Sequence, residues 1–306
     1  MRGRRRALQA LAALAGPITW PMAACANDLA WPGASWDSAA APASGWNTDR
    51  LRQADAEARQ IGSDAVLVVH RGRVVHEYGD TSKAVNVYSG RKSVLSGLLG
   101  MQVDAGRLNP DSTLAALGID DKQGLSAVEK TATVRHLLQS RSGIYHPAAY
   151  ETLAAKAERP ARGSHAPGLH WYCNNWDFNT LGTVYRQASG KTVFEGFLSD
   201  LATPLQMQHF RAAEHTSWEL ERSSQHPAYV MQLSARDFAR FGIFWAHAPG
   251  DVFYASGNHG QLLWVDRARD IVVVHGTDHT RWLRASPDVG RLAPLLKHIF
   301  DARPEA

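Results

Sequence analysis

Cysteine is scarce in this 306-residue sequence, which contains only Cys25 and Cys173. Cys25 lies in an N-terminal segment that has the features of a removable leader, so the mature chain would retain a single cysteine. A single cysteine excludes an intramolecular disulfide, and stability must then come from a packed core. Cys173 could be read as a nucleophile, but we expect it to be a small buried side chain.

Long apolar runs and an excess of charge are also missing. The apolar stretch 7–18 is too short to cross a bilayer, so no transmembrane helix is predicted. The formal net charge of +4 comes from four arginines before residue 27, where no acidic residue balances them. The rest of the chain is therefore formally neutral, and without a basic patch a nucleic-acid partner is not expected.

The N-terminus has the pattern of a signal peptide. An arginine-rich start at 2–6 precedes the apolar stretch, and Ala24-Cys25-Ala26 is a cleavage site with small residues at the required positions. We expect 1–26 to be removed and the protein to be periplasmic or secreted. Met22-Ala23-Ala24-Cys25 also resembles a lipoprotein box, which would place a lipid anchor on Cys25. The remaining alternative is a tail that targets nothing.

The composition beyond the leader is that of a folded domain, with 44% apolar and 20% charged residues. Residues 27–47 are expected to form an extended arm, and 48–303 the domain. Apolar periodicity and turn signals predict the secondary structure. Strands are expected at 65–70, 74–78, 252–255, 261–265 and 271–275, and helices at 49–61, 89–104, 109–117, 133–138, 171–187, 194–201, 235–241 and 287–300.

Strands thus lie at both ends of the domain and helices in its middle. This order predicts an α/β (α+β) fold, in which one antiparallel sheet formed by N- and C-terminal strands carries the terminal helices. The sheet lobe would span about 48–88 and 251–303, and a mainly helical lobe about 89–250. A site is expected in the cleft between them. The long loop 145–170 would contribute His146, His165 and His170 to the rim of that cleft.

Ser89 and Lys92 stand at the start of the expected helix 89–104. They are three residues apart, so they share one helical face. The first turn offers free N–H groups and partial positive charge, which favour an oxyanion and a neutral amine able to accept the serine proton. Gly97 and Gly100 would allow neighbours to pack closely on the same helix. Taken alone, the pair also fits a capping serine and a solvated lysine.

Three motifs occur in an order that resembles a known family. Ser89-x-x-Lys92 is followed by Tyr172-Cys173-Asn174 at a helix start and by Gly257-Asn258-His259-Gly260-Gln261 before a strand. Segments 133–143 and 265–273 add weaker matches. Over about 48–300 the chain is similar to the serine β-lactamase-like and penicillin-binding-protein-like hydrolases, nearest their class C, D-aminopeptidase and esterase-type branch.

This resemblance implies roles for the first two motifs. Ser89 would be the acylated nucleophile and Lys92 its base. Tyr172 would carry the proton to the leaving group and could share the work of the base. Asn174 would orient Lys92 or a substrate amide.

The third motif would complete the site. The backbone N–H groups of Ser89 and Gln261 would form the oxyanion hole, and Gly260 would leave room for the substrate. His259 stands where relatives carry the cation that holds a β-lactam carboxylate, and it could serve only when protonated, so true β-lactamase activity is not favoured. The segment 241–254 is shorter than in relatives, which predicts a more open cleft.

The resulting prediction is an exported serine hydrolase acting on small esters or amides through an acyl-enzyme on Ser89, with no metal or cofactor. Lys92 must be neutral to act as the base. Burial, the helix N-terminus and an inward-turned Arg91 would each lower the lysine pKa. The short segment before Asp251 keeps an alternative open. In that alternative the same fold serves as a binding or sensor protein that is acylated once or not at all.

Overall fold

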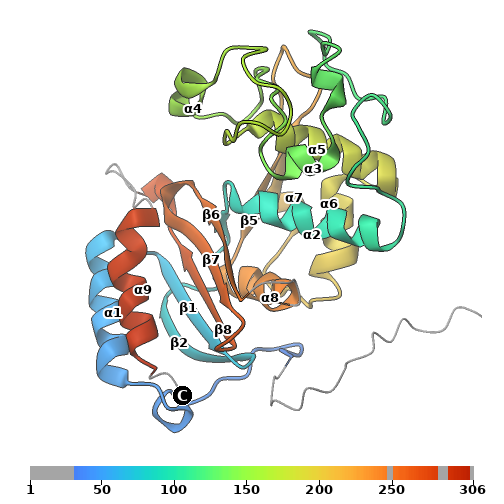
Figure 1. Cartoon of the computed structure of the whole chain (residues 1–306). Helices are drawn as coiled ribbons and strands as arrows, with labels where there is room; N and C mark the ends of the chain where they lie inside the picture. The colour runs from blue at the N-terminus through green and yellow to red at the C-terminus, as the bar shows by residue number, and fades with distance from the viewer. Residues whose placement is uncertain (1–30, 247–250, 282–288, 304–306) are drawn as a thin grey trace, which may run out of the picture.

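The computed structural model describes residues 31–246, 251–281 and 289–303, and shows a sheet lobe beside a mainly helical lobe (Figure 1). This arrangement confirms the predicted α+β architecture. The proposed leader, 1–26, lies outside the described residues. In the part of the chain that is described, no helix has the length and apolarity needed to span a membrane.

The main sheet joins strands from the two ends of the domain. It has five strands in the order β2-β1-β8-β7-β6, and every neighbouring pair is antiparallel. β1 is buried along its whole length, so both faces of the sheet must be covered. The bounds are β1 (Ala65–His70), β2 (Arg73–Gly79), β6 (Val252–Gly257), β7 (Gln261–Asp266) and β8 (Ile271–Gly276).

Helices from distant parts of the chain cover the two faces of this sheet. α1 (Thr48–Ile61) and α9 (Ala293–Asp301) pack side by side on one face, and α8 (Ala235–Trp245) packs on the other (Figure 1). Alternate residues of β1 therefore enter different cores: Val66 lies with α1 and α9, and Leu67 with α8. The period-2 alternation of a strand produces this division.

The helical lobe contains mostly short helices. They are α2 (Gly90–Asp104), α3 (Val134–Leu138), α4 (Leu153–Glu158), α5 (Asn175–Ser189), α6 (Val193–Gly196), a π-helical turn (Phe197–Ala202) and α7 (Ala212–His215). Short 3₁₀ turns occur at Pro42–Ser44, Glu129–Thr131, Asn258–Gly260, His279–Arg281 and Val289–Leu292.

Two features of this lobe differ from the sequence-based expectation. A second sheet of order β3-β5-β4 is present, formed by β3 (Val85–Asn86), β4 (Thr216–Glu219) and β5 (Ala228–Leu233). The helix expected at 109–117 is absent, and the segment forms turns. Its backbone is bonded elsewhere, since Leu114 N–H donates to the Ala132 carbonyl at 2.8 Å and Thr113 forms a β-bridge with Thr133.

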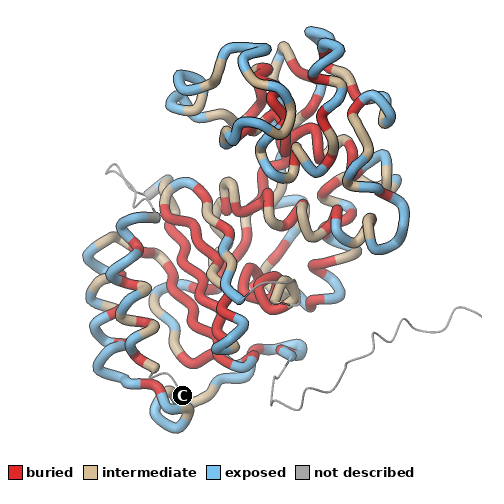
Figure 2. Tube along the Cα trace, viewed as in Figure 1, coloured by how far each residue is buried: buried red, intermediate tan, exposed pale blue. Residues whose placement is uncertain are grey.

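The buried residues in Figure 2 continue from the sheet into the helical lobe. One apolar cluster contains Leu67 of β1, Leu98 of α2, Trp176 of α5 and Phe241 of α8, so α2 is fixed against both lobes. Gly97 allows this approach, because a Cβ there would lie 3.3 Å from the Phe241 ring. The prediction for Gly100 is wrong, since nothing lies within 4 Å of a Cβ at that position.

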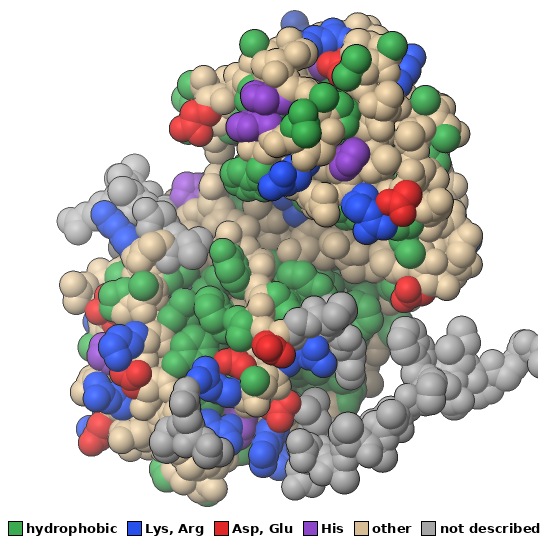
Figure 3. All heavy atoms as spheres, viewed as in Figure 1, with side chains coloured by type: hydrophobic (Ala, Val, Ile, Leu, Met, Phe, Trp, Pro, Cys, Tyr) green, Lys and Arg blue, Asp and Glu red, His purple; other side chains and the backbone are tan. Residues whose placement is uncertain are grey.

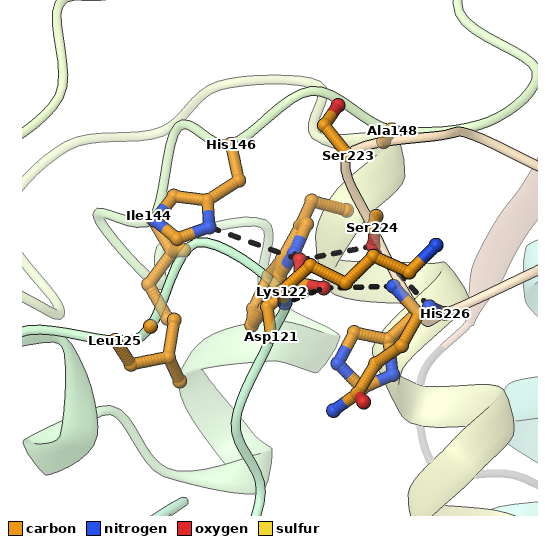
Figure 4. A network of polar contacts seen from close by, with 12 residues as sticks. Asp121, Lys122, Leu125, Ile144, His146, Ala148, Ser223, Ser224 and His226 are labelled. Carbon is orange, nitrogen blue, oxygen red and sulfur yellow. Dashed lines mark hydrogen bonds and ion pairs between the residues drawn. The ribbon is translucent and has the colours of Figure 1, made fainter.

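A buried carboxylate ties the loops of the helical lobe to α5 (Figure 4). Asp121 accepts hydrogen bonds from Trp176 Nε1 at 2.6 Å, from Ser224 Oγ at 2.9 Å and from Gln225 N at 2.8 Å. His146 Nδ1 lies 3.7 Å from the same carboxylate. His146 is therefore an interior residue, and its expected place on the rim of a cleft is wrong.

Candidate active site

Ser89 occupies a tight turn that leads from β3 into α2. It is the N-cap residue of α2, as the sequence predicted for the first turn of this helix. The preceding residue, Tyr88, has φ +47°, a left-handed conformation that a bulky side chain rarely adopts. Asn86 Oδ1 accepts from the Tyr88 N–H at 2.8 Å and supports this turn. Such local strain is typical of functional positions.

Lys92 is buried one helical turn further on. Its Nζ lies 4.9 Å from the centre of the Phe178 ring and donates to Cys173 Sγ at 3.7 Å. Burial lowers the lysine pKa, the Cys173 thiol opposes that shift, and the Arg91 charge lowers the pKa further. Two of the three causes expected from the sequence, burial and Arg91, are thus confirmed.

Arg91 does turn inward. Its side chain is only 1% exposed, and its guanidinium lies 4.5 Å from the Tyr229 ring centre and 5.3 Å from that of Tyr150. Cation–π contacts partly replace the water that this charge has lost. A cation held this close to α2 disfavours a second cation on Lys92.

The side chains of the second motif point in different directions. Tyr172 Oη donates to the Ala155 carbonyl of α4 at 2.7 Å, and burial raises the tyrosine pKa. Asn174 caps α5 by accepting from Trp176 N, and donates to the Ile144 carbonyl at 2.7 Å. Of the three motif residues, only Cys173 makes a hydrogen bond with Lys92. The roles assigned to Tyr172 and Asn174 stay predictions.

Cys173 is exposed, so the expectation of a small buried side chain is wrong. α5 begins at Asn175, four positions later than the helix predicted from the sequence, and 171–174 precede it without regular structure. The thiol therefore lies at the boundary between solvent and the buried amine of Lys92. This combination of one exposed and one buried partner is the distinctive feature of the site.

Asp177 lies beneath the site and was not singled out from the sequence. It is fully buried, accepts from Ser142 Oγ and from Asn174 Nδ2, and its Oδ2 has no hydrogen-bond partner among the described residues. Burial raises the carboxyl pKa well above its usual range. An acidic residue between Trp176 and Phe178, on the apolar face of α5, was the available signal.

The third motif forms a turn from β6 into β7. Gly257, at the end of β6, lies against the Ser89 backbone, and a Cβ there would be 3.1 Å from Ser89 N. The N–H of Gln261 donates to the Asn258 carbonyl, so in this conformation it is not free to bind an oxyanion. Gln261 Nε2 donates to the Thr277 carbonyl at 2.7 Å. Gly260, at φ +75°, allows the turn to reverse.

His259 closes the site from the same turn. Its ring lies 4.9 Å from that of Tyr88 and stacks on His279 at 4.8 Å, while Tyr88 Oη is 2.5 Å from His279 Nδ1. Burial and the neighbouring His279 lower the His259 pKa below the usual 6.5. The imidazole is therefore mainly neutral at pH 7.

His275 is buried and forms hydrogen bonds with Ser63 and with the Gly260 carbonyl. Among the described residues, no group of three or more His, Cys, Asp or Glu side chains is arranged to bind a metal ion.

Comparisons with known proteins identify the family and the fold. The family model described as Beta-lactamase matches residues 48–251. Among solved structures, a putative 6-aminohexanoate-dimer hydrolase from Bacillus anthracis is similar at TM-score 0.63 and 16% identity, covering 90% of this chain and 88% of its own. Comparison of the sequence with curated proteins gives no match.

Two further structures share the fold. A putative beta-lactamase from Bacteroides dorei DSM 17855 has TM-score 0.61 and 16% identity, covering 84% of this chain and 99% of its own. EstCE1, described as a hydrolase with promiscuous acyltransferase activity, has TM-score 0.59 and 13% identity, covering 83% of this chain and 98% of its own.

Proposed function

The chain belongs to the beta-lactamase family, and on that basis we propose that it is an exported serine hydrolase acting on small esters or amides through an acyl-enzyme on Ser89. The observation that carries this proposal is the environment of Lys92. A lysine buried beside a buried arginine, one turn from a serine at a helix N-terminus, is arranged to be a neutral base.

The chemistry follows from that arrangement. Neutral Lys92 accepts the hydroxyl proton of Ser89 while Oγ forms a bond to the substrate carbonyl carbon. The Ser89 N–H, at the start of α2, is placed to stabilise the developing oxyanion. The bond to the leaving alcohol or amine then breaks as that group takes up a proton. Water attacks the acyl-enzyme by the reverse proton transfers and regenerates the free serine.

The surroundings of the site support uncharged substrates. A mainly neutral His259 stands where relatives would hold a carboxylate with a cation. For the bond that is cleaved, rather than for substrate charge, two similar structures add support: one is a putative 6-aminohexanoate-dimer hydrolase and another is a hydrolase with promiscuous acyltransferase activity. An ester or amide without a nearby carboxylate is the substrate class that suits this chain.

Export is the second part of the proposal and rests on the leader pattern at 1–26. The intact mass of protein from the native host tests it. A mature chain beginning at Asn27 agrees with a cleaved signal peptide, and an acylated N-terminal Cys25 selects the lipoprotein alternative. Retention of 1–26 contradicts export.

A chromogenic short-chain ester tests the activity. The purified protein should hydrolyse many equivalents, form a Ser89 adduct visible by mass spectrometry in an acid quench, and lose turnover in Ser89→Ala. A burst equal to the amount of protein, without turnover, favours the binding or sensor alternative. Turnover that survives in Ser89→Ala contradicts the mechanism itself.

A further inference from the structure

We propose that the Cys173 thiol is a further catalytic residue, which passes the proton between Lys92 and the leaving group in place of Tyr172. The inference rests on the proposed hydrolase function and adds a proton path to it. It assigns to a cysteine the part that the family resemblance gave to a tyrosine.

Contact with the base is the first support. Lys92 Nζ donates to Cys173 Sγ at 3.7 Å, a distance within the range of hydrogen bonds to sulfur. Lys92 is 8% exposed, whereas Cys173 is exposed. A proton on the buried amine therefore has a titratable neighbour on its solvent side, where a substrate must enter.

The position of Tyr172 is the second, independent support. Its hydroxyl donates to the Ala155 carbonyl of α4 at 2.7 Å, and its ring packs edge-on against Tyr145 at 5.8 Å. Burial raises the pKa of this phenol, which makes it harder to ionise and a weaker proton donor. Because 171–174 form an irregular segment before α5, adjacent side chains need not share a face, and Cys173 faces the base while Tyr172 faces the loop.

The surrounding groups leave Cys173 as the exchange partner of Lys92. The other charged groups that act on Lys92 are Arg91, which cannot give up its proton, and Asp177, which is fully buried. Asp177 directs its Oδ1 to Ser142 and Asn174. Among the described residues, the thiol alone combines a hydrogen bond to Nζ with access to solvent.

The proposed relay balances at each step. Lys92 takes the proton of Ser89 as Oγ bonds to the carbonyl carbon. Cys173 S–H then gives its proton to the leaving oxygen or nitrogen as the carbon–leaving-group bond breaks, and the Lys92 ammonium returns a proton to the thiolate. Deacylation runs the same transfers in reverse, with water in place of the leaving group. No oxidant or reductant is needed.

Matched variants separate the two candidates for this role. Cys173→Ala should lower kcat about 100-fold, the usual size of a general acid–base contribution. Cys173→Ser should keep more activity than alanine, because a hydroxyl can still pass a proton. Tyr172→Phe, which loses only the bond to α4, should stay within about threefold of wild type. The inference is overturned if Cys173→Ala is fully active or if Tyr172→Phe is the more damaging change.

Reversible blocking of the thiol gives a readout that needs no substitution. Methyl methanethiosulfonate converts Cys173 to a methyl disulfide, and activity should fall with one equivalent incorporated and return on addition of dithiothreitol. Cys173→Ser should be insensitive to the reagent. Full activity of the blocked enzyme would contradict the relay.

The contact with Lys92 is tested without turnover. The thiol should react with 5,5′-dithiobis(2-nitrobenzoic acid) about tenfold more slowly in Lys92→Met, because that variant lacks the neighbouring amine that can take up the thiol proton. Equal rates in Ser89→Ala and wild type provide the control, and equal rates in Lys92→Met and wild type overturn the inference. If Ser89→Ala retains turnover, the proposed function fails. If Ser89→Ala is inactive and Cys173→Ala is normal, only this inference fails.

Discussion

Gly257 at the end of β6 touches the backbone of the nucleophile turn. A Cβ on Gly257 would lie 3.1 Å from Ser89 N, 3.0 Å from Tyr88 Cβ and closer still to the Val87 carbonyl oxygen. No flexible side chain stands between the strand and the turn, so any added atom must displace backbone. The edge of the sheet thereby sets the position of the Ser89 N–H, the proposed oxyanion donor.

Gly257→Ala is therefore expected to lower kcat by about tenfold or more, because displacements of this kind at a reacting centre are costly. Gly100→Ala is the matched control, since it lies in α2 with nothing within 4 Å of the new Cβ. The control should keep kcat and gain about 1 kcal/mol of stability from helix propensity. Steady-state kinetics and thermal melts on both proteins decide the matter, and an unchanged kcat in Gly257→Ala would contradict this role.

Lys92 should set the alkaline dependence of the reaction. Burial lowers its pKa, and the neutral amine is the active form, so kcat/KM should rise with pH and level off well below the free-lysine value of about 10.4. Lys92→Arg keeps the charge, cannot deprotonate, and should lose most of the activity. A pH–rate profile with an uncharged substrate measures this rise in kcat/KM. If kcat/KM rises only near the free-lysine pKa, or if Lys92→Arg is active, Lys92 is not the neutral base.

The same burial gives Lys92 a cost in stability. Because the folded-state pKa is lowered, the unfolded chain binds more protons than the folded one between that pKa and about pH 10.4, so stability rises with pH across this window. Lys92→Met should remove that dependence and add on the order of 1 kcal/mol at neutral pH while abolishing turnover. Denaturant melts at pH 7 and pH 10 test this, and a less stable Lys92→Met would count against it.

The Asp121 network predicts how the helical lobe responds to acid. Burial raises the pKa of Asp121, but the nearby His146 and hydrogen bonds from Trp176 and the backbone outweigh it and lower the pKa far below the usual value. Its stabilising contribution is therefore present above about pH 3.9 and is lost as pH falls towards the folded-state pKa.

Asp121→Asn should cost about 3 kcal/mol at neutral pH and flatten the acid limb of stability. Asp111→Asn is the control, because Asp111 pairs with Arg135 on the surface and its loss should change little. Melting temperatures between pH 2.5 and 7 compare the three proteins. Similar losses in both variants would mean that the network contributes no more than a surface pair.

The sequence was most informative for β1 and for the turn that holds Ser89 and Lys92, where the signal is local. The continuous apolar run of β1 and the three-residue spacing of Ser89 and Lys92 depend on neighbours in the chain, and the structure has both the strand and the helical turn. The second sheet was missed because β3, which has only two residues, pairs with β5 from far away in the sequence, and because the short β4 reaches β5 only through the loop 220–227. Such pairing leaves no local period to read.

The site shows the same limit at closer range. Which of Tyr172 and Cys173 faces Lys92 depends on where α5 begins, and Asn174 sets that point by capping the helix. Likewise, the N–H of Gln261 is engaged because His259 adopts φ +62° and closes a turn before β7. Helix caps and left-handed turns are decided by single residues. An apolar pattern locates the end of a helix or strand only to within a few residues, so it does not predict them.

Substrate charge gives the last prediction, which depends on His259. Its pKa is lowered by burial and by His279, so at pH 7 it offers no cation to a carboxylate. Protonation below its pKa adds that cation, whereas Lys92 loses activity with any substrate as pH falls. The ratio of kcat/KM for a carboxylate-bearing ester to that for its methyl ester cancels the effect of Lys92. This ratio should rise as pH falls from 8 towards 5.

His259→Lys should raise the ratio about tenfold at pH 7, because it supplies a permanent cation at the same turn, and should remove most of its pH dependence. Lysine and histidine both carry a Cβ at the φ of +62°, so the exchange adds little backbone strain. His279→Gln is the control: it removes the neighbour that lowers the His259 pKa and should move the rise in the ratio to higher pH. If the ratio does not change with pH in the wild type and is the same in His259→Lys, His259 does not face the bound substrate.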